Sequence, residues 1–211
     1  MSAREVTALK RLGLAALLLA PVTAVASAAE LTPVQAFDLY AQVIVHGDAA
    51  AQATLAGYLD TDNGPALAAA LAGASHLDEA PELADWPKAA AALRKRQTSV
   101  HCTIDSVRHA QADSAYVDYR CYLPDLSALL PVYRQHSVPF NGPHPPQMAR
   151  ELATAYTQMM AVAPDRERII TVSFKRDHDG GPWHVQNPTP LMSGLADAFL
   201  PFFEWNEHLP N

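Results

Sequence analysis

The sequence contains only two cysteines in 211 residues, and no lysine or arginine occurs between Glu30 and Pro87. It also lacks the serine nucleophile elbow, the phosphate-binding glycine loop and the C-x-x-C spacing of zinc sites and redox-active pairs. Because each of these motifs carries one class of chemistry, their absence argues against the corresponding enzymes. We therefore predict that the protein is not an enzyme and that it uses no cofactor and no metal.

The first 28 residues have the layout of a secretory signal peptide. Three basic residues precede an apolar run from Leu12 to Ala20, and Ala26-Ser27-Ala28 fits an A-x-A cleavage site. The run is too short for a membrane anchor, which needs roughly 20 residues. The first cysteine is Cys102, so no lipid-attachment cysteine lies at the cleavage site. The sequence therefore predicts a soluble periplasmic protein with no stable membrane anchor.

Removal of residues 1–28 leaves 12 basic and 21 acidic residues, a formal charge of −9. The acidic excess lies in the first third of the mature chain, whereas both signs are balanced from Lys88 onward. Such a field repels nucleic acid and attracts cationic partners. We therefore predict no nucleic-acid binding and a protein partner with a basic surface. The alternative is that these acids only keep an alanine-rich helical surface soluble.

Helical patterns dominate the first half of the mature sequence. Thr32-Pro33-Val34-Gln35 predicts a capping box at the start of a helix, which Gly47 ends. Asp48 can cap a second helix to about Leu59. An acidic surface segment is expected at 75–86, a proline-rich loop at 139–146 and an irregular or briefly helical end at 191–211. Further helices are predicted at 65–73, at about 87–97 and from Pro145 or Pro146 onward.

The hydrophobic period changes to two at 100–105 and 116–123, which predicts two strands joined by a turn at 109–113. A hairpin folded about Gln111 and Ala112 places Cys102 directly opposite Cys121. A disulfide between them fits an oxidising compartment, and closing a loop of about 20 residues is worth on the order of 3 kcal/mol. Another strand is predicted at 168–175, followed by a turn at 177–181 and a returning strand.

This order of elements resembles the NTF2-like superfamily, whose members pack N-terminal helices on a curved antiparallel sheet as an α+β cone. Leu31-Thr32-Pro33 through Gly47-Asp48 is similar to the first helix of that family. Asp179-Gly180-Gly181-Pro182-Trp183-His184-Val185 is similar to the D-G-x-W-x-V ending of its last hairpin. The resemblance spans residues 31–187 and implies one α+β domain at 29–190. The family includes small enzymes, ligand binders and immunity or adaptor proteins, so the fold does not select a function.

The resemblance also implies a rival function, a small-molecule binder or enzyme that uses the interior of the cone. Enzymes of this superfamily use Asp, Tyr or His in that interior, where burial raises a carboxyl pKa toward neutrality. No motif selects among these residues. Among the nine histidines, His178 and His184 flank one turn but show no metal-ligand spacing, and surface positions explain them better. The residues of the required types are Asp38, Tyr40, Asp105, Asp118 and Tyr119.

The last 21 residues, 191–211, form a tail that contains Phe199-Leu200-Pro201-Phe202-Phe203-Glu204-Trp205. Two interpretations fit this aromatic segment. It can fold back to close the open end of the cone, or it can serve as an exposed docking patch, because aromatic anchors dominate interface energetics.

Together these patterns predict a periplasmic immunity or inhibitor protein that neutralises a cationic antibacterial effector protein. Acidic side chains would raise the association rate, and aromatic side chains would lengthen the residence time. A role in envelope assembly or stress response is a third alternative, and the oligomeric state is left open. The predicted partner-binding residues are Asp60, Asp62, Asp78, Glu79, Glu82, Asp85, Phe202, Phe203 and Trp205.

Overall fold

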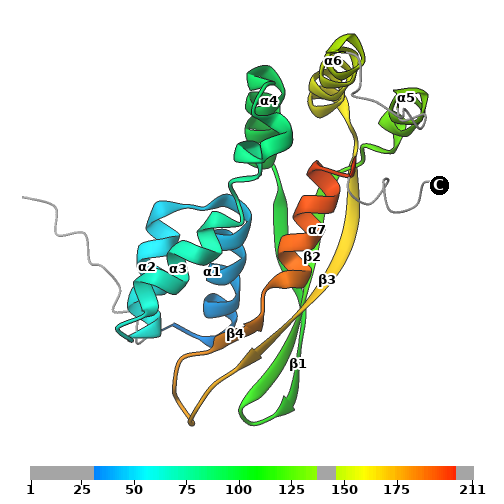
Figure 1. Cartoon of the computed structure of the whole chain (residues 1–211). Helices are drawn as coiled ribbons and strands as arrows, with labels where there is room; N and C mark the ends of the chain where they lie inside the picture. Colours follow the sequence, from blue (N-terminus) through cyan, green and yellow to red (C-terminus); the bar gives the residue numbers. More distant parts are fainter. Residues whose placement is uncertain (1–30, 137–145, 203–211) are drawn as a thin grey trace, which may run out of the picture.

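The structure is a computed structural model that describes residues 31–136 and 146–202 (Figure 1). The predicted signal peptide and the tail residues Phe203 and Trp205 lie outside these ranges. Within them, the fold is α+β, with seven α-helices and one four-stranded antiparallel sheet in the order β1-β2-β3-β4. No helix in the described ranges is both long enough and apolar enough to span a membrane.

Local capping signals determine where the first helices begin and end. The backbone N–H of Thr32 donates to Gln35 Oε1 at 2.9 Å, and the Gln35 N–H donates to Thr32 Oγ1 at 3.3 Å, which completes the predicted capping box. Gly47 ends the same helix with a φ of 59°, a conformation that favours glycine. Asp48 then caps the next helix through the N–H of Ala51. The predicted helices correspond to α1 (Pro33–His46), α2 (Ala49–Leu59), α3 (Gly64–Gly73) and α4 (Pro87–Gln97).

Shorter turns and three further helices complete the helical part. The predicted acidic surface segment contains the 3-10 turns η2 (Leu77–Glu79) and η3 (Pro81–Leu83). Between the second and third strands, the chain passes through η4 (Ser127–Leu129), α5 (Leu130–His136) and α6 (Pro146–Val162). Figure 1 shows α4, α5 and α6 at one end of the sheet, away from α2 and α3.

The sheet consists of β1 (His101–Gln111), β2 (Ser114–Pro124), β3 (Asp165–Lys175) and β4 (His184–Asn187). The disulfide between Cys102 and Cys121 is confirmed, and the two residues are paired across β1 and β2. The turn of this hairpin lies at residues 112–113, one position later than the predicted centre. Register shifts between 104 and 106 and between 109 and 111 compensate for the difference. The pairing prediction was therefore right although its turn position was wrong.

The inner face of the sheet packs against α1 through aromatic rings and buried hydroxyl groups. The ring centroids of Phe37 and Phe174 lie 4.6 Å apart. The Tyr119 hydroxyl donates to the carbonyl of Phe37 at 2.7 Å, and the Tyr40 hydroxyl donates to the carbonyl of Trp183 at 2.8 Å. Because both hydroxyls are buried and satisfied, these hydrogen bonds fix α1 to strand β2 and to the residue that precedes β4.

The first part of the predicted tail forms a helix, α7 (Thr189–Phe199), which packs into the core through Leu195 and Phe199. The Tyr156 hydroxyl donates to the carbonyl of Phe199 at 2.8 Å. Phe202 follows and contacts the rings of Tyr133 and Tyr156, with centroids 5.5 and 5.7 Å away. The described part of the tail is thus joined to the core of the domain.

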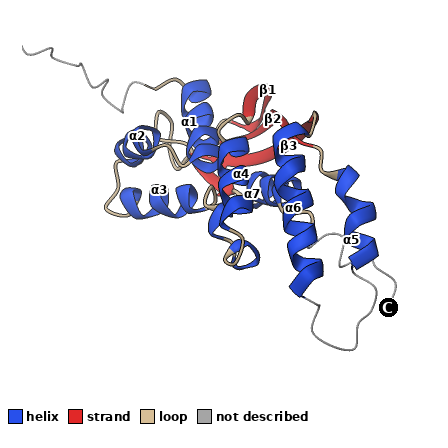
Figure 2. Ribbon diagram, turned by 90° about the horizontal axis from the view of Figure 1, so that it is seen from above, coloured by secondary structure: helices blue, strands red, loops and turns tan. Residues whose placement is uncertain are grey.

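The described helices lie to one side of strands β1–β3 when the molecule is seen from above, and none covers the other side (Figure 2). The exposure of outward-pointing side chains agrees, since Tyr116 is 45% exposed and Ile169 is 49% exposed. The α+β class is therefore confirmed, while the assignment to an NTF2-like cone stays a prediction. The uncovered side of the sheet is therefore the candidate for a functional surface.

Candidate functional site

The uncovered side of the sheet presents a regular grid of polar and aromatic side chains, which we call the open sheet face. Strand geometry creates it, because alternate residues of a strand point to opposite faces. On β2 the residues with even numbers point outward, and the antiparallel registers place outward residues of β1 and β3 beside them. The open sheet face consists of Thr103, Asp105, Ser106 and Arg108 from β1, Tyr116, Asp118, Arg120 and Tyr122 from β2, and Glu167, Ile169, Thr171 and Ser173 from β3.

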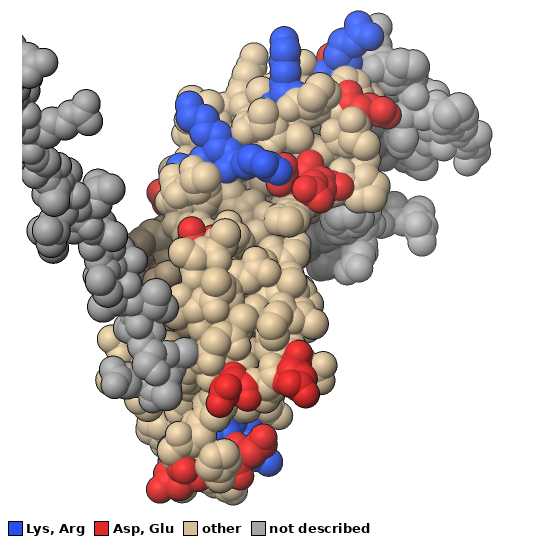
Figure 3. All heavy atoms as spheres, turned by 90° about the vertical axis from the view of Figure 1, so that its left-hand side faces the viewer, with Lys and Arg blue, Asp and Glu red and all other residues tan. Residues whose placement is uncertain are grey.

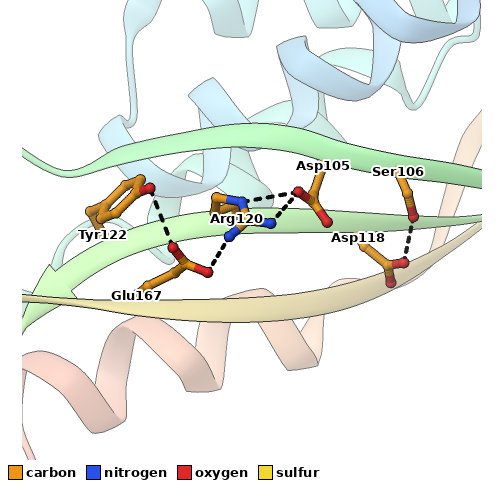
Figure 4. Close-up of polar contacts among 6 residues, drawn as sticks. All are labelled: Asp105, Ser106, Asp118, Arg120, Tyr122 and Glu167. Atoms are coloured by element: carbon orange, nitrogen blue, oxygen red, sulfur yellow. Dashed lines mark hydrogen bonds and ion pairs between the residues drawn. The ribbon is translucent and has the colours of Figure 1, made fainter.

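Asp118 is the centre of one hydrogen-bond network on this face, and Figure 4 shows its contact with Ser106. Its carboxylate accepts from the hydroxyls of Ser106 and Thr171, each at 2.6 Å. Arg108 adds a forked contact, with Nε at 3.3 Å and Nη2 at 3.1 Å. The hydrogen bonds from Ser106, Thr171 and Arg108 lower the pKa of Asp118 to about 2. The carboxylate is therefore ionised at all physiological pH values and is held by neighbours on the two flanking strands, β1 and β3.

Arg120 is the centre of a second network one step along β2. Its guanidinium donates to Asp105 from Nε at 2.9 Å and also forms an ion pair with Glu167. Asp105 occupies the register shift between Ile104 and Ser106, where β1 has one residue more than its partner strand. A bulge of this kind redirects a side chain, and here it accompanies the contact of Asp105 with Arg120. Figure 4 shows Arg120 between the two carboxylates, which come from neighbouring strands.

Large side chains lie exposed around these two networks. Tyr116, Tyr122 and Ile169 are 45%, 38% and 49% exposed. The Arg108 guanidinium lies over the Tyr116 ring, 5.7 Å from its centroid. Protein interfaces are enriched in Tyr and Arg, and buried Tyr and Arg anchors contribute most of their binding energy. The open sheet face thus has the composition of a protein-binding surface with an ordered polar centre.

The acids predicted to bind a partner lie in two separate places. Asp60 and Asp62 lie at the turn between α2 and α3, before the ten residues of α3, which span about 15 Å at 1.5 Å per residue. The four later acids occur together on the segment around η2 and η3. Arg94 forms an ion pair with Asp78 at 2.5 Å, and Glu79 lies 3.8 Å from His76. Asp78, Glu79, Glu82 and Asp85 therefore share one short segment, and α3 lies between that segment and Asp60 and Asp62 along the chain.

Figure 3 shows the face of the molecule on which the first helices lie. Its acidic side chains form separate groups, and the upper group borders several basic side chains. One of the predicted acids, Asp78, is neutralised by its ion pair with Arg94. The acidic excess of the sequence is therefore distributed over this face and does not form one continuous patch.

The residues considered for catalysis inside a cone do not converge on one site. Asp105 and Asp118 belong to the open sheet face and are paired with arginines. Tyr40 and Tyr119 lie in the core, where burial raises the pKa of both hydroxyls, and each donates to a backbone carbonyl. Asp38 accepts from Gln42 at 2.7 Å. In the ranges that the structure describes, no group of three or more His, Cys, Asp or Glu side chains could hold a metal ion.

Arg108, Arg120 and Glu167 were not predicted as site residues from the sequence, nor were Tyr116 and Tyr122. The signal was present in the alternation of β2, where Tyr116, Asp118, Arg120 and Tyr122 repeat at a period of two. A row of this kind is ordinary for a solvated strand. It becomes a candidate site only because the register brings opposite charges from three strands together and leaves tyrosines exposed between them.

Comparisons with known proteins do not assign this chain to a family. No family model matches the sequence, and no curated protein matches it. A crystal structure of a protein described as a "putative lipoprotein (ycdA)" from Bacillus subtilis subsp. subtilis str. 168 is similar, with a TM-score of 0.40 and 16% sequence identity. The match covers 79% of this chain and 55% of that chain, so this chain spans little more than half of that protein's length. A similarity of this size carries no argument about function.

Proposed function

We propose that this chain is a periplasmic binding protein that holds a protein partner with a basic surface on the open sheet face. More specifically, we propose an immunity or inhibitor protein with an NTF2-like fold, whose partner is a cationic antibacterial effector protein. The observation that carries the proposal is the open sheet face itself. Three exposed large side chains surround ion-paired networks there, and no described helix covers them.

Pre-organisation is the physical reason why this surface suits binding. Asp118 and Arg120 are already held by neighbouring strands, so a partner does not have to order them. Tyrosine has few rotatable bonds for its contact area, which keeps the entropy cost of contact low. Tyr116 and Tyr122 are six residues apart on one strand, or about 20 Å at 3.3 Å per residue. A patch of this length suits a standard-size protein interface better than a small ligand.

The basic character of the partner follows from the charge of the chain. The open sheet face carries three carboxylates (Asp105, Asp118 and Glu167) against two guanidinium groups (Arg108 and Arg120). Residues 29–211 have a formal charge of −9, and acids such as Asp62 and Asp85 make no ion pair within the described ranges. Long-range attraction by such a field raises the association rate of a cationic protein and weakens with salt.

Affinity capture with paired alanine variants tests the proposal. The bait is the purified protein, and the extract is that of the cell envelope of the same organism. The test variant is Tyr122→Ala with Ile169→Ala, which removes two anchors from the open sheet face. The control is Leu67→Ala with Val162→Ala, because these side chains are exposed apolar residues on α3 and α6, 38% and 73% exposed. Thermal melts of both variants confirm that each remains folded.

The proposal expects one basic protein that the wild type and the control retain, and that the test variant retains at least tenfold less well. Capture must also fall as the salt concentration rises, since screening weakens the attraction. Equal capture by the two variants would place the interface elsewhere on the molecule. Capture of an acidic protein, unaffected by salt, would contradict the proposed partner class.

A further inference from the structure

A pocket of about 580 Å³ lies away from the open sheet face, between the start of α1, the end of α2 and the turn that joins β3 to β4. Apolar groups of Leu31, Pro33 and Pro182 line part of it. Tyr58, Arg176 and Trp183 contribute the aromatic and polar part of the lining. The volume is within the range of small-molecule sites, and both polar and apolar groups line the pocket.

Two hydrogen-bond donors in this pocket have unused capacity. The Tyr58 hydroxyl accepts the backbone N–H of Trp183 at 2.8 Å, and its own proton has no acceptor among the described residues. Arg176 donates from Nε and Nη2 to the carbonyl of Ala112, at 3.0 and 2.8 Å, and its Nη1 has no acceptor in the same ranges. The charge of Arg176 also lowers the pKa of Tyr58, against the larger upward effect of burial. The two donors therefore share one electrostatic environment.

The Arg176 guanidinium is held in place before any ligand arrives. It lies over the Trp183 ring, 5.1 Å from the ring centroid, and only 20% of its side chain is exposed. The hydrogen bonds to Ala112 connect it to the tip of the β1–β2 hairpin. A guanidinium fixed in this way keeps the free N–H groups of Nη1 in a defined direction, and a charged donor of this kind forms a strong hydrogen bond to a carboxylate.

We infer that this pocket binds a small organic carboxylate that carries an apolar group. Arg176 Nη1 and the Tyr58 hydroxyl donate to the carboxylate, and the apolar group contacts Trp183 and the proline rings. This site is separate from the open sheet face and does not depend on the proposed protein partner.

Three other titratable groups surround the pocket, and one of them competes with a ligand for Arg176. Asp60 and His178 belong to the lining, and Asp179 forms an ion pair with Arg176 at 2.7 Å. The Asp179 side chain is 95% exposed, so a ligand carboxylate can displace it at small cost. Asp179 is therefore an internal competitor for Arg176, and its removal strengthens ligand binding.

Titration of the purified protein with phenylacetate, followed by two-dimensional NMR, tests the inference. Phenylacetamide is the matched probe, since it has the same ring and no charge. We expect saturable shifts at Trp183 and Gly181 with phenylacetate, and at least tenfold weaker binding of phenylacetamide. Arg176→Gln weakens phenylacetate binding tenfold or more, Tyr58→Phe weakens it about threefold, and Asp179→Asn strengthens it two- to threefold. Arg134→Gln, an exposed arginine on α5, leaves it unchanged.

Since Arg176 also holds the hairpin tip, Arg176→Lys provides a second variant that keeps the positive charge and loses the planar guanidinium with its Nη1 donor. Weaker binding by a folded Arg176→Lys protein supports recognition by the fixed Nη1 donor. Equal binding of phenylacetate and phenylacetamide would overturn the inference, as would unchanged affinity in every Arg176 variant that folds. The inference would also be overturned if no chemical-shift change appeared up to about 50 mM phenylacetate, a concentration well above the dissociation constant of a specific site.

Discussion

Asp118→Asn is the substitution that tests the polar centre of the open sheet face. Asparagine has nearly the same shape as aspartate, but it carries no charge and replaces one acceptor oxygen by a donor. Three side chains donate to Asp118, namely Ser106, Thr171 and Arg108. At least one of them loses its acceptor in the variant, so the variant unfolds more readily than the wild type.

The size of this effect follows from the pKa of Asp118, which falls from 3.8 to about 2 in the folded protein. A shift of this size corresponds to about 2 kcal/mol of the free energy of unfolding at neutral pH. Arg108 is 60% exposed, so solvent screens part of the interaction. We therefore expect Asp118→Asn to lower the free energy of unfolding by about 1 kcal/mol at pH 7.

Urea unfolding of both proteins between pH 7 and pH 2 measures the effect. Because the folded pKa is lower than the unfolded one, the contribution is complete above about pH 4 and disappears as the pH falls toward 2. The difference between the two proteins should therefore shrink over this interval. Asp62→Asn is the control, since Asp62 is exposed and makes no ion pair in the described ranges. A difference that stays constant from pH 7 to pH 2, or an Asp118 carboxyl that titrates near 3.8 by NMR, would show that the hydrogen bonds to Asp118 do not stabilise its ionised form.

Four further predictions test other parts of the account. Replacement of Cys102 and Cys121 by serine should lower the free energy of unfolding by about 3 kcal/mol in the loop-closure model, and added reductant should no longer destabilise the variant in urea melts. Tyr40→Phe removes the buried hydrogen bond to Trp183 and should lower the free energy of unfolding by about 1–2 kcal/mol in the same urea assay; an unchanged unfolding curve would contradict this. Gly47→Ala should destabilise by about 1 kcal/mol or more, because φ is 59° and the new Cβ would lie 2.2 Å from Oγ of the buried Ser75; a thermal melt at or above the wild-type midpoint would contradict this. N-terminal sequencing of the exported protein should begin at residue 29, whereas an intact first residue would contradict the predicted cleavage.

Local signals made several elements predictable from sequence. The capping box at Thr32 and the glycine at position 47 fix α1, because they act within a single turn of helix. The disulfide was predictable because only two cysteines exist and the strand pattern places them opposite each other. The two strands that carry the cysteines contain two register shifts that no local pattern predicts. Because of these shifts the cysteines pair as predicted, although the turn lies one position later than predicted.

Elements that depend on tertiary packing were less predictable. α7 contains Pro190 and Gly194, and its sequence suggested an irregular or briefly helical segment. The helix forms because Leu195 and Phe199 are buried, and Gly194 allows close approach to Ile170, whose Cδ1 would lie 2.7 Å from an added Cβ.

The open sheet face could not be predicted from the sequence either. The alternation of residues in β2 does not show which side of the sheet the helices cover. The pairing of Asp78 with Arg94 joins residues 16 positions apart, so it weakened a predicted acidic cluster in a way that charge counting could not reveal.

Site-specific photo-crosslinking in living cells identifies which surface of the protein contacts its partner. A photoreactive phenylalanine analogue is placed at Tyr122 or Ile169 on the open sheet face, and at Val162 on α6 as the control. We predict that one basic protein is crosslinked from positions 122 and 169 and not from position 162. Crosslinks that form only from position 162, or none from either sheet position in cells that carry the partner, would contradict the assignment of this face as the binding surface.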